Sequence, residues 1–364
     1  MKRHSETNQA VTMRDVAEQS GFSPATVSIV LNNAPLARYI APTTKKRIED
    51  TAKKLGYRPN VMARFLRSKR SHSIGVLFFD ITDPFCTLIM RGVENALYQA
   101  SYLAIFADAH NQRNRFERYL ELLLERHVEG LIVVANWLFV DIHVLADLSK
   151  RNIPSATIGW ELPGGNNISS VMVDNETGAR LALEHLYQLG HRKIAFIRGP
   201  KMLIDSAPRW RGIQKFAHSA GLEIDSSLVL QLPDSLDPNS SFESGHRYTE
   251  DLLEQKKKFT AVMAFDDLTA LGAIRALTKA GVKVPEQCSV TGFDDIALSS
   301  LAAPSLTTVR QPMEAMGGLA VNIVMEGINA ALEKRDWNVV NQKMNPELVI
   351  RDSTRAVSLT GAND

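Results

Sequence analysis

Charged and aromatic side chains stand directly after several short apolar runs of this 364-residue chain. If these runs are buried parallel strands, their carboxyl ends meet at one edge of a sheet, which is where open α/β folds bind ligands. Carboxylates beside an aromatic face suit a polyhydroxylated ligand such as a sugar. The residues concerned are Asp80 and Asp83 after 74–79, Trp160 after 155–159, and Asp266 after 260–265.

Catalytic chemistry has less support in the sequence. The patterns G-x-x-x-x-G-K-[ST], H-E-x-x-H and G-x-S-x-G are absent. Asp266 and Asp267 could form a carboxylate pair for acid–base work, but no partner nucleophile is evident. His191 stands at a helix-to-strand turn, where a structural cap is the expected role, and Cys86 and Cys288 lack metal-ligand spacing. We therefore expect no enzyme activity, no cofactor and no metal site.

The most informative pattern lies in residues 11–32, which read VTMRDVAEQSGFSPATVSIVLN. Two short helices are expected around a tight turn at Gly21. The first starts at Thr12 with a capping box, and the second starts with Ser23 as cap and Pro24 as first helical residue. Such a helix-turn-helix places its second helix in the DNA major groove, and two surface helices of a larger domain are the alternative. The expected small core comprises Val16, Ala17, Val27, Val30 and Leu31.

The distribution of charge agrees with one DNA-binding end. Residues 1–72 contain 14 Lys and Arg against 5 Asp and Glu, and the remainder contains 28 against 35. This asymmetry is typical of a protein that contacts phosphates with one end only, although a solvated basic face would have the same charge. The chain has no apolar leader and no run of eighteen apolar residues, so we expect no secretory signal and no membrane span. Two cysteines without a disulfide framework favour the cytoplasm.

From Val11 to about Arg355, the sequence resembles the lac/galactose/purine repressor family of bacterial transcription regulators. The matching motifs are T-M-R-D-V-A, S-P-A-T-V-S, L-G-Y-R-P-N and A-R-F-L. The resemblance implies an all-α helix-turn-helix headpiece and a two-lobed body like that of periplasmic binding proteins. The expected segments are a disordered extension at 1–10, the headpiece at 11–58, a hinge helix and linker at 59–72, the body at 73–355 and a tail at 356–364.

The body alternates short apolar runs with helical stretches, which predicts an α/β fold with parallel sheets. Its roughly 280 residues are many for one such sheet, so two lobes are expected. The expected strands are 74–79, 102–106, 130–135, 155–159, 193–197, 226–232, 260–265 and 288–293, with a last one near 348–350. The expected helices lie near 86–100, 115–128, 142–151, 175–189, 208–220, 243–255, 267–280 and 311–332. The resemblance places lobe 1 at about 73–168 and 308–333, and lobe 2 at about 169–307 and 334–355.

The resemblance also implies which residues of the headpiece contact DNA. Pro24, Ala25 and Ile29 are expected to face base edges, and none has a side-chain donor. We therefore expect contacts to thymine methyl groups and readout of DNA shape, with burial in the headpiece core as the alternative for Ile29. Contacts to phosphates that set the register are expected from Thr12, Arg14, Ser23, Thr26, Ser28 and Asn32.

Two further segments bear on DNA binding. In the hinge helix, the resemblance implies that Leu66 enters between base pairs, with Ala63 as the close-packing position; packing of Leu66 on the body is the alternative. Asn60, Arg64 and Arg67 are the other expected DNA contacts there. The loop after Asn32 is about three residues longer than is usual in the family, and Arg38 and Tyr39 either add a backbone contact or form a solvated bulge.

In the body, Arg209 and Asp294 match the family's effector-binding arginine and carboxylate, with a structural ion pair as the alternative. Asp80, Phe85, Trp160 and Asp266 complete the expected effector site. A sugar is the first expectation for the effector; nucleobases, nucleosides and other polar metabolites are the alternatives, and Asp266 argues against a strongly anionic one. Replacing Arg209 or Asp294 by alanine is expected to abolish the effector response while folding stays largely intact.

Together these features predict a cytoplasmic, nucleoid-associated transcriptional regulator that binds double-stranded operator DNA under the control of a small polar effector. A repressor is expected; an activator of the same architecture, or a solute-binding protein without DNA activity, are the alternatives. The effector could induce or corepress. The tail after Arg355 has no leucine heptads, which favours a homodimer over a tetramer.

Overall fold

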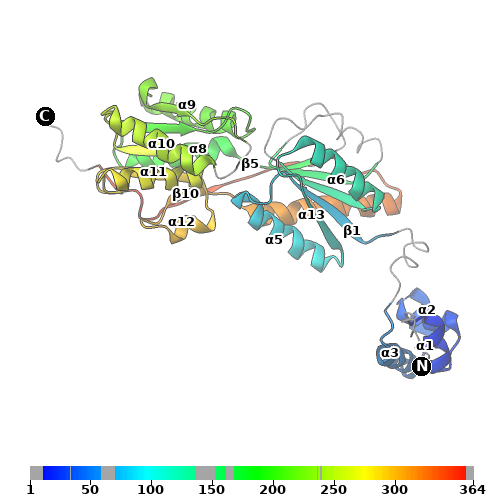
Figure 1. Cartoon of the computed structure of the whole chain (residues 1–364). Coiled ribbons are helices and arrows are strands. Elements are labelled where there is room, and N and C mark those ends of the chain that lie inside the picture. The colour runs from blue at the N-terminus through cyan, green and yellow to red at the C-terminus, as the bar shows by residue number, and fades with distance from the viewer. Residues whose placement is uncertain are drawn as a thin grey trace. The chain divides into compact units, whose positions relative to one another are not determined.

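The computed structural model describes residues 11–357 except for 33, 59–69, 136–151, 161–167, 236, 238 and 239. The chain divides into two units (Figure 1): Met1–Ser71, which contains the headpiece, and His72–Asp364, which contains the body. The helix expected near 142–151 lies outside the described residues. So do five of the expected DNA contacts, namely Asn60, Ala63, Arg64, Leu66 and Arg67.

The described part of the headpiece consists of short helices with well-defined ends. Thr12 caps the first helix in the predicted capping box, and Ser23 caps the second by accepting a hydrogen bond from the Thr26 N–H at 3.1 Å. Gly21 and Gly56 end the first and third helices at φ 73° and 67°, a left-handed conformation that favours glycine. The elements are α1 (Met13–Ser20), α2 (Pro24–Leu31), the 3₁₀ helix η1 (Pro35–Tyr39) and α3 (Pro42–Leu55).

One small apolar cluster holds these helices together. Ile48 of α3 is fully buried with Val16 of α1 and Val27 of α2. The other buried members are Ala17, Val30 and Ala52, with Leu31 partly buried at the edge. The predicted core residues are therefore confirmed, and α3 supplies the part of the core that fixes α1 and α2.

The first lobe of the body is built on a parallel six-stranded sheet in the order β11-β5-β4-β3-β1-β2. Side chains along β1 alternate between its two faces. Ile74, Val76 and Phe78 pack with α5 and α13, and Leu77 packs with α6 on the other face. The strands are β1 (Ser73–Phe78), β2 (Leu103–Asp108), β3 (Gly130–Val134), β4 (Ser155–Ile158), β5 (Ser169–Val173) and β11 (Asn341–Met344), and the helices are α5 (Pro84–Gln99), α6 (Arg113–Glu125) and α13 (Met313–Glu333).

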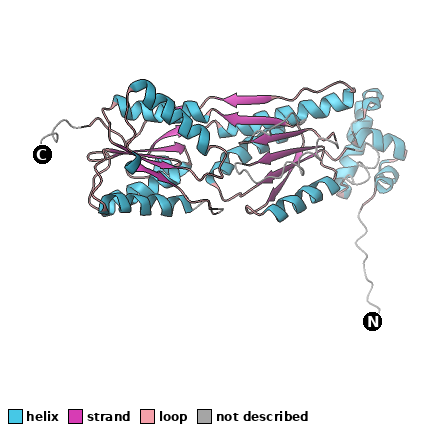
Figure 2. Cartoon of the chain, turned by 90° about the horizontal axis from the view of Figure 1, so that it is seen from above, coloured by secondary structure: helices cyan, strands magenta, loops and turns pink. Residues whose placement is uncertain are grey.

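The second lobe has its own six-stranded sheet, in the order β12-β10-β9-β8-β6-β7. All pairs are parallel except β10 with β12. Figure 2 shows the two groups of strands with helices on both sides of each. The strands are β6 (Ile194–Arg198), β7 (Val229–Gln231), β8 (Ala261–Ala264), β9 (Ser289–Asp294), β10 (Thr307–Arg310) and β12 (Glu347–Val349), and the helices are α8 (Asn175–Gln188), α9 (Ser206–Ala220), η2 (Ser226–Leu228), α10 (Ser240–Glu254), α11 (Asp267–Lys279) and α12 (Ala297–Leu301).

The helix α13 is the one described segment that is long and apolar enough to cross a membrane. Its residues Met316, Ala320 and Val324 are fully buried against the first sheet and α5. About half of its most apolar stretch is buried inside the protein. Because these side chains fill the core of the first lobe, we assign α13 as a core helix.

The expected lobe boundaries are wrong at three strands. Segment 169–173, expected in lobe 2, forms β5 and pairs with β4 in the first sheet. Segment 307–310, at the expected start of a lobe 1 segment, forms β10 in the second sheet, and 341–344, expected in lobe 2, forms β11 beside β5. The apolar pattern of the sequence did not predict β5, because its first two residues are buried serines. Their polar groups are satisfied by the late strand region, with the Ser170 hydroxyl 2.9 Å from the Asn341 side chain and the Val340 N–H 3.1 Å from Ser169 Oγ.

Candidate functional site

One face of α2 points away from the core of the headpiece. Val27 and Val30 anchor the helix in the headpiece core, whereas Pro24 and Ala25 are exposed. Ile29 is partly exposed and lies outside the apolar cluster. Burial in the core therefore does not account for Ile29, and the three residues expected at base edges present small or apolar surfaces on α2.

The residues expected to contact phosphates cluster at helix starts and at the end of α2. Thr12 and Ser23 cap α1 and α2, so they stand beside backbone N–H groups that attract anions. Arg14 is exposed on the first turn of α1. The side chain of Asn32 donates to the Ser28 carbonyl at 2.8 Å, which fixes the end of α2. Thr26 and Ser28 are partly exposed on α2.

The long loop after α2 contains the 3₁₀ helix η1 with one buried and several exposed residues. Ala37 is buried. Tyr39 is 72% exposed, and the Arg38 guanidinium lies 4.7 Å from its ring centroid. The loop therefore displays a stacked arginine and tyrosine at the surface. This is compatible with both expected alternatives, a contact to the DNA backbone and a solvated bulge.

A cavity opens in the body, with lining residues from both lobes. The first lobe contributes the start of α5, including Asp83 and Phe85. The second lobe contributes the starts of α9, α10 and α11 and the end of β9. Its lining includes Asp205, Arg209, Phe265, Asp266, Asp267, Asp294 and Gln311.

Arg209 is the best-held charged side chain at this cavity, with a side-chain exposure of only 7%. Its guanidinium donates to Asn175 Oδ1 at 2.9 Å, to the Phe265 carbonyl at 2.6 Å and to Asp294 Oδ1 at 3.3 Å. It also lies 4.4 Å and 3.6 Å from the ring centroids of Phe265 and Phe293. These contacts fix the position of the guanidinium before any ligand arrives.

Asp294 stands at the end of β9 in a strained backbone conformation, with φ 116°. Its Oδ1 accepts hydrogen bonds from Arg209 and, at 2.6 Å, from Gln311 Nε2. Burial raises the pKa of Asp294 well above its ordinary value, and the charge of Arg209 opposes that rise. Arg209 and Asp294 thus form an ion pair and also line the cavity, so the two expected alternatives, a structural ion pair and a ligand-binding pair, are compatible.

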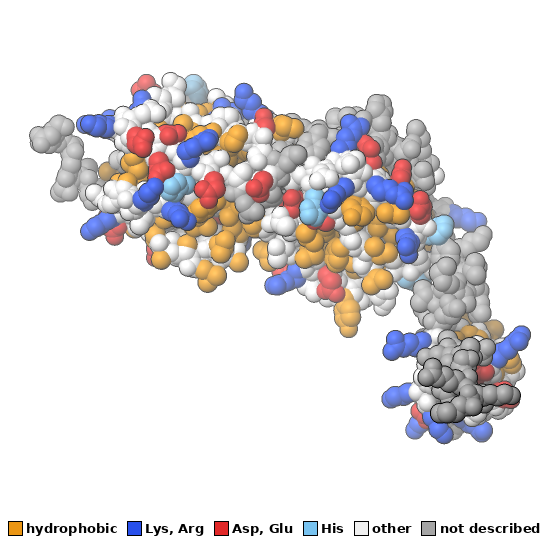
Figure 3. Space-filling model, in the orientation of Figure 1, with side chains coloured by type: hydrophobic (Ala, Val, Ile, Leu, Met, Phe, Trp, Pro, Cys, Tyr) orange, Lys and Arg blue, Asp and Glu red, His pale blue; other side chains and the backbone are white. Residues whose placement is uncertain are grey.

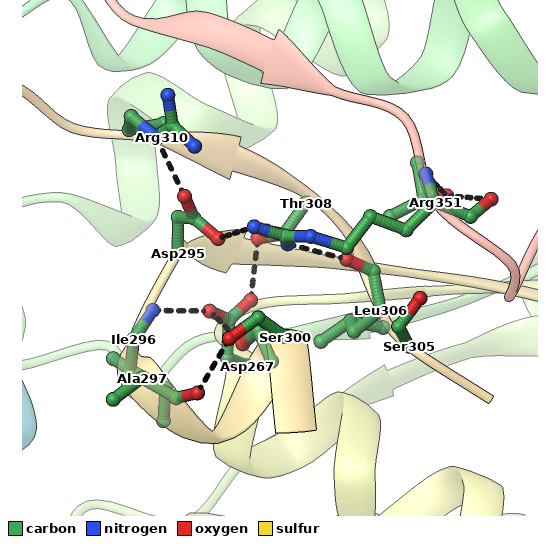
Figure 4. Close-up of polar contacts among 12 residues, drawn as sticks. Asp267, Asp295, Ile296, Ala297, Ser300, Ser305, Leu306, Thr308, Arg310 and Arg351 are labelled. Carbon is green, nitrogen blue, oxygen red and sulfur yellow. Dashed lines mark hydrogen bonds and ion pairs between the residues drawn. The ribbon is translucent and has the colours of Figure 1, made fainter. Parts of the chain in front are cut away.

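A polar network holds Asp295 and Ile296, the two residues that follow β9 (Figure 4). The neighbouring Asp295 bonds Arg310 of β10 and Arg351 of the C-terminal segment, each at 2.6 Å. Asp267, fully buried at the start of α11, accepts from the Ile296 N–H at 2.9 Å and also from the hydroxyl groups of Ser299 and Thr308. Since its hydrogen bonds are all directed to the protein frame, Asp267 positions the site.

Asp83 and Asp266 carry open carboxylate oxygens. Each caps a helix through Oδ1, Asp83 by accepting from the Phe85 N–H at 3.0 Å and Asp266 by accepting from the Thr269 N–H at 2.7 Å. Burial raises the pKa of Asp83 to about 6, and the negative charges of Asp266, Asp80 and Asp205 add to the rise.

Four of the six expected effector residues line the cavity, namely Phe85, Arg209, Asp266 and Asp294. Trp160 does not, since it is 4% exposed in the core of the first lobe. Gly159 turns the chain just before it at φ 83°, and the tryptophan packs beneath the sheet. Asp80 borders a neighbouring pocket that shares Asp83 and Phe85 with this cavity, and its carboxylate accepts from Asn111 Nδ2 and the Thr82 N–H at 2.9 Å each.

Asp83 was noted after its strand but was not part of the expected effector site, and Asp205 and Gln311 were not expected at all. Asp83 directly precedes Pro84, which makes it a helix cap after a strand. Asp205 stands four residues before Arg209 at the start of α9, within 4.0 Å of its guanidinium. Both positions were visible as acidic residues at helix starts, but Gln311 enters the site by crossing from β10 to α13, which no local pattern indicates.

Replacing Asp83 by asparagine is expected to stabilise the body near pH 7.5. The pKa of Asp83 is higher in the folded chain than the ordinary value, so the folded state gains protons and stability falls as pH rises from about 4 to about 6. Asparagine removes this loss and can still cap α5. The gain in melting temperature over the parent should shrink below about pH 6 and disappear near pH 4. Asp174→Asn, at the cap of α8, is the control; a pH-independent gain for Asp83→Asn would contradict the assignment.

Comparison with known proteins covers both units of the chain. A family model described as bacterial regulatory proteins, lacI family, matches residues 12–60, which include α1, α2 and α3. A model described as a periplasmic binding protein-like domain matches residues 183–354, within the body. The two matches fall on the headpiece and on the cavity-bearing unit.

Full-length relatives share this arrangement. The chain is 33% identical over 350 residues to the HTH-type transcriptional repressor PurR of Haemophilus influenzae, covering 95% of this chain and 99% of that protein. It is 30% identical over 348 residues to CytR of Escherichia coli, covering 96% and 97%. Among solved structures, a lac repressor dimer bound to operator and the anti-inducer ONPF matches with a TM-score of 0.81 at 27% identity, covering 96% and 100%. A complex of the regulator CelR with cellobiose matches with a TM-score of 0.69 at 27% identity, covering 94% and 99%.

Proposed function

Because the chain belongs to the lacI family of bacterial regulatory proteins, we propose that α1 and α2 contact operator DNA and that the cavity binds the controlling effector. The chain is a sequence-specific DNA-binding transcriptional regulator under effector control. The outward face of α2 carries the proposal for the DNA contact. Val27 and Val30 face inward while Pro24, Ala25 and Ile29 face away from the core.

Base recognition by this face has to rely on apolar contact and DNA shape. Pro24, Ala25 and Ile29 have no side-chain hydrogen-bond donor, so they cannot read guanine as a bidentate arginine does. Contact with thymine methyl groups and preference for deformable steps are the available means. Thr12, Arg14 and Ser23 would set the register through phosphates.

Operator selection tests the proposal directly. The full chain is incubated with a random DNA pool, bound DNA is recovered over several rounds, and the affinity is measured by gel shift. We expect a site with two pseudo-symmetric halves, because a dimer presents two copies of α2. Equal affinity of a chain lacking residues 1–70 for the selected site would overturn the proposal.

The contribution of phosphate contacts is measurable through salt dependence. Arg14→Ala is expected to weaken operator and non-specific binding together and to reduce the slope of log affinity against log salt by about one ion. Arg118→Ala on α6 of the body, an exposed arginine paired with Glu121, is the matched control and should leave the slope unchanged. An unchanged slope for Arg14→Ala would remove this residue from the interface.

We propose a repressor whose effector lies against Phe85 from the first lobe and Arg209, Asp266 and Asp294 from the second. A ligand that touches both lobes has a different affinity for different lobe arrangements, and this difference is what can change operator affinity. The relative CelR is solved with cellobiose, which supports a sugar-sized ligand. An activator of the same architecture would use the same contacts and differs only in the position of its operator relative to a promoter.

A catalytic role for the cavity is disfavoured by its carboxylates. Asp267 is fully buried and directs its hydrogen bonds to the protein frame, so Asp266 and Asp267 do not form an acid–base pair facing a substrate. We also propose a cytoplasmic location, since operator DNA is there and Cys86 and Cys288 are both free thiols.

The homodimer is expected to bury apolar side chains that a single chain leaves exposed. Figure 3 shows hydrophobic side chains gathered on the lower side of the body of one chain, over α12 and α5. Leu301 of α12 and Tyr98 of α5 are 77% and 78% exposed. Leu301→Asp is expected to shift the chain from dimer to monomer in sedimentation and to weaken operator binding by about 100-fold, since two linked headpieces bind together. Leu332→Asp, at the end of α13, is the control; a stable Leu301→Asp dimer would place the interface elsewhere.

A further inference from the structure

The lining of the cavity has far more acidic than basic side chains. Its described residues include six aspartates and one cation, Arg209, and that cation is already bonded to Asn175, Phe265 and Asp294. A neutral ligand can donate hydrogen bonds to these carboxylates but supplies no counter-charge. An anionic ligand would add repulsion.

Two of these carboxylates present a free oxygen. Asp83 and Asp266 each use Oδ1 for a helix cap, and among the described residues neither Oδ2 has a hydrogen-bond or ion-pair partner. Asp83 belongs to the first lobe and Asp266 to the second. Burial is the main cause of the raised pKa of Asp83, and the negative charges of Asp266, Asp80 and Asp205 add to it. The cavity therefore sets like charges of the two lobes against each other.

The group that best satisfies such acceptors is an ammonium. It offers three donors from a compact full charge, so it can reach carboxylates on both lobes at once. A bare metal ion fits less well, because no three acidic, histidine or cysteine side chains in the described part of the chain are placed to share one. The rings of Phe85 and Phe265 provide apolar surface for the rest of a sugar-sized molecule.

We propose that the effector is a protonated amine of sugar size, an amino sugar or a close analogue, whose ammonium lies between Asp83 of the first lobe and Asp266 of the second. Its hydroxyl groups form hydrogen bonds with Arg209 and Asp294. Binding neutralises the repulsion between the lobes and so favours their closed arrangement. This inference rests on the proposed effector function of the cavity and adds the chemical class of the ligand.

Matched ligands test the charge requirement on the full-length protein. Each amino sugar of a panel is paired with its neutral parent and with the 6-phosphate of that parent: glucosamine, glucose and glucose 6-phosphate, and the corresponding galactose and mannose sets. Calorimetry and thermal shift measure binding, and gel shift with the selected operator measures the response. We expect at least one amine to bind at least about tenfold more tightly than its neutral parent, with no detectable binding of the phosphate.

Variants separate the two carboxylates from general folding. Asp83→Asn and Asp266→Asn keep a capping side chain but remove the charge, and each should reduce the preference for the amine over its neutral parent by about tenfold. Asp174→Asn is the matched control, because Asp174 caps α8 in the same way through the Thr177 N–H at 3.0 Å and does not line the cavity. An unchanged preference in both cavity variants would overturn the placement of the ammonium.

The outcomes distinguish failure of the amine assignment from failure of the proposed effector control. If a neutral sugar or a phosphate changes operator affinity and its amine does not, effector control stands and the amine assignment is wrong. If no member of the panel binds at millimolar concentration, the amine assignment is equally rejected. Loss of effector control itself would require that a broader metabolite screen also leaves operator binding unchanged.

Discussion

Arg209→Ala should abolish the response of operator binding to effector and destabilise the body by about 3–5 kcal/mol, the usual cost of breaking a buried ion pair by removing one partner. The variant leaves the carboxylates of Asp294 and Asp205 buried without their counter-charge. The Phe265 carbonyl and Asn175 Oδ1 also lose their donor. The sequence alone suggested that folding would stay largely intact, and the burial of this side chain changes that expectation.

The pH dependence identifies the cause of the instability. In Arg209→Ala, the uncompensated Asp294 and Asp205 can take up protons, so the deficit relative to the parent should be largest near pH 7.5 and shrink toward pH 5. Arg211→Ala is the matched control on the same helix, because Arg211 is 53% exposed and pairs with Glu176 at the surface. It should keep both stability and effector response. If Arg209→Ala matched this control in both measurements, neither role of Arg209 would hold.

Local sequence signals were sufficient where the structure depends on neighbours in the chain. The capping box at Thr12, the Ser23–Pro24 helix start and the glycine ends at Gly21 and Gly56 each involve residues within four positions. The buried strands around Val76 and Val262 could also be predicted, because strands covered on both faces are continuously apolar. These signals located the headpiece and most of the two sheets.

Features that the sequence did not predict depend on the direction of side chains and on pairing between distant segments. Trp160 follows a strand, as a ligand-binding residue would, but the left-handed Gly159 turns it into the core. Asp80 and Asp83 are three residues apart after the same strand, and only the backbone path decides that Asp83 lines the cavity while Asp80 bonds Asn111 and borders the neighbouring pocket. The strand β5 depends on a partner about 170 residues later, Asn341. No spacing in the sequence contains this information.

Ile48→Ala should abolish operator binding while the body stays folded and able to bind effector. Ile48 of α3 is fully buried against α1 and α2, and loss of such a side chain typically costs about 2–5 kcal/mol. Domains as small as the headpiece have only a few kcal/mol of stability to lose. If only about 1% of headpieces remain folded, the apparent affinity of each falls about 100-fold.

The contrast with Ile29→Ala distinguishes folding of the headpiece from its contact with bases. Ile29 lies on α2 but outside the apolar cluster, so its replacement should leave the headpiece folded. Specific operator affinity should fall by the about 1–3 kcal/mol typical of one lost base-pair preference, with non-specific binding unchanged. Amide hydrogen exchange of α1–α3 measures folding, and gel shift with selected and random DNA measures both affinities. Ile48→Ala should lose both affinities together with exchange protection, because an unfolded headpiece no longer presents its phosphate contacts in register. Equal loss of protection in the two variants would mean that Ile29 supports the core, and the proposed contact of α2 with bases would then lose its central residue.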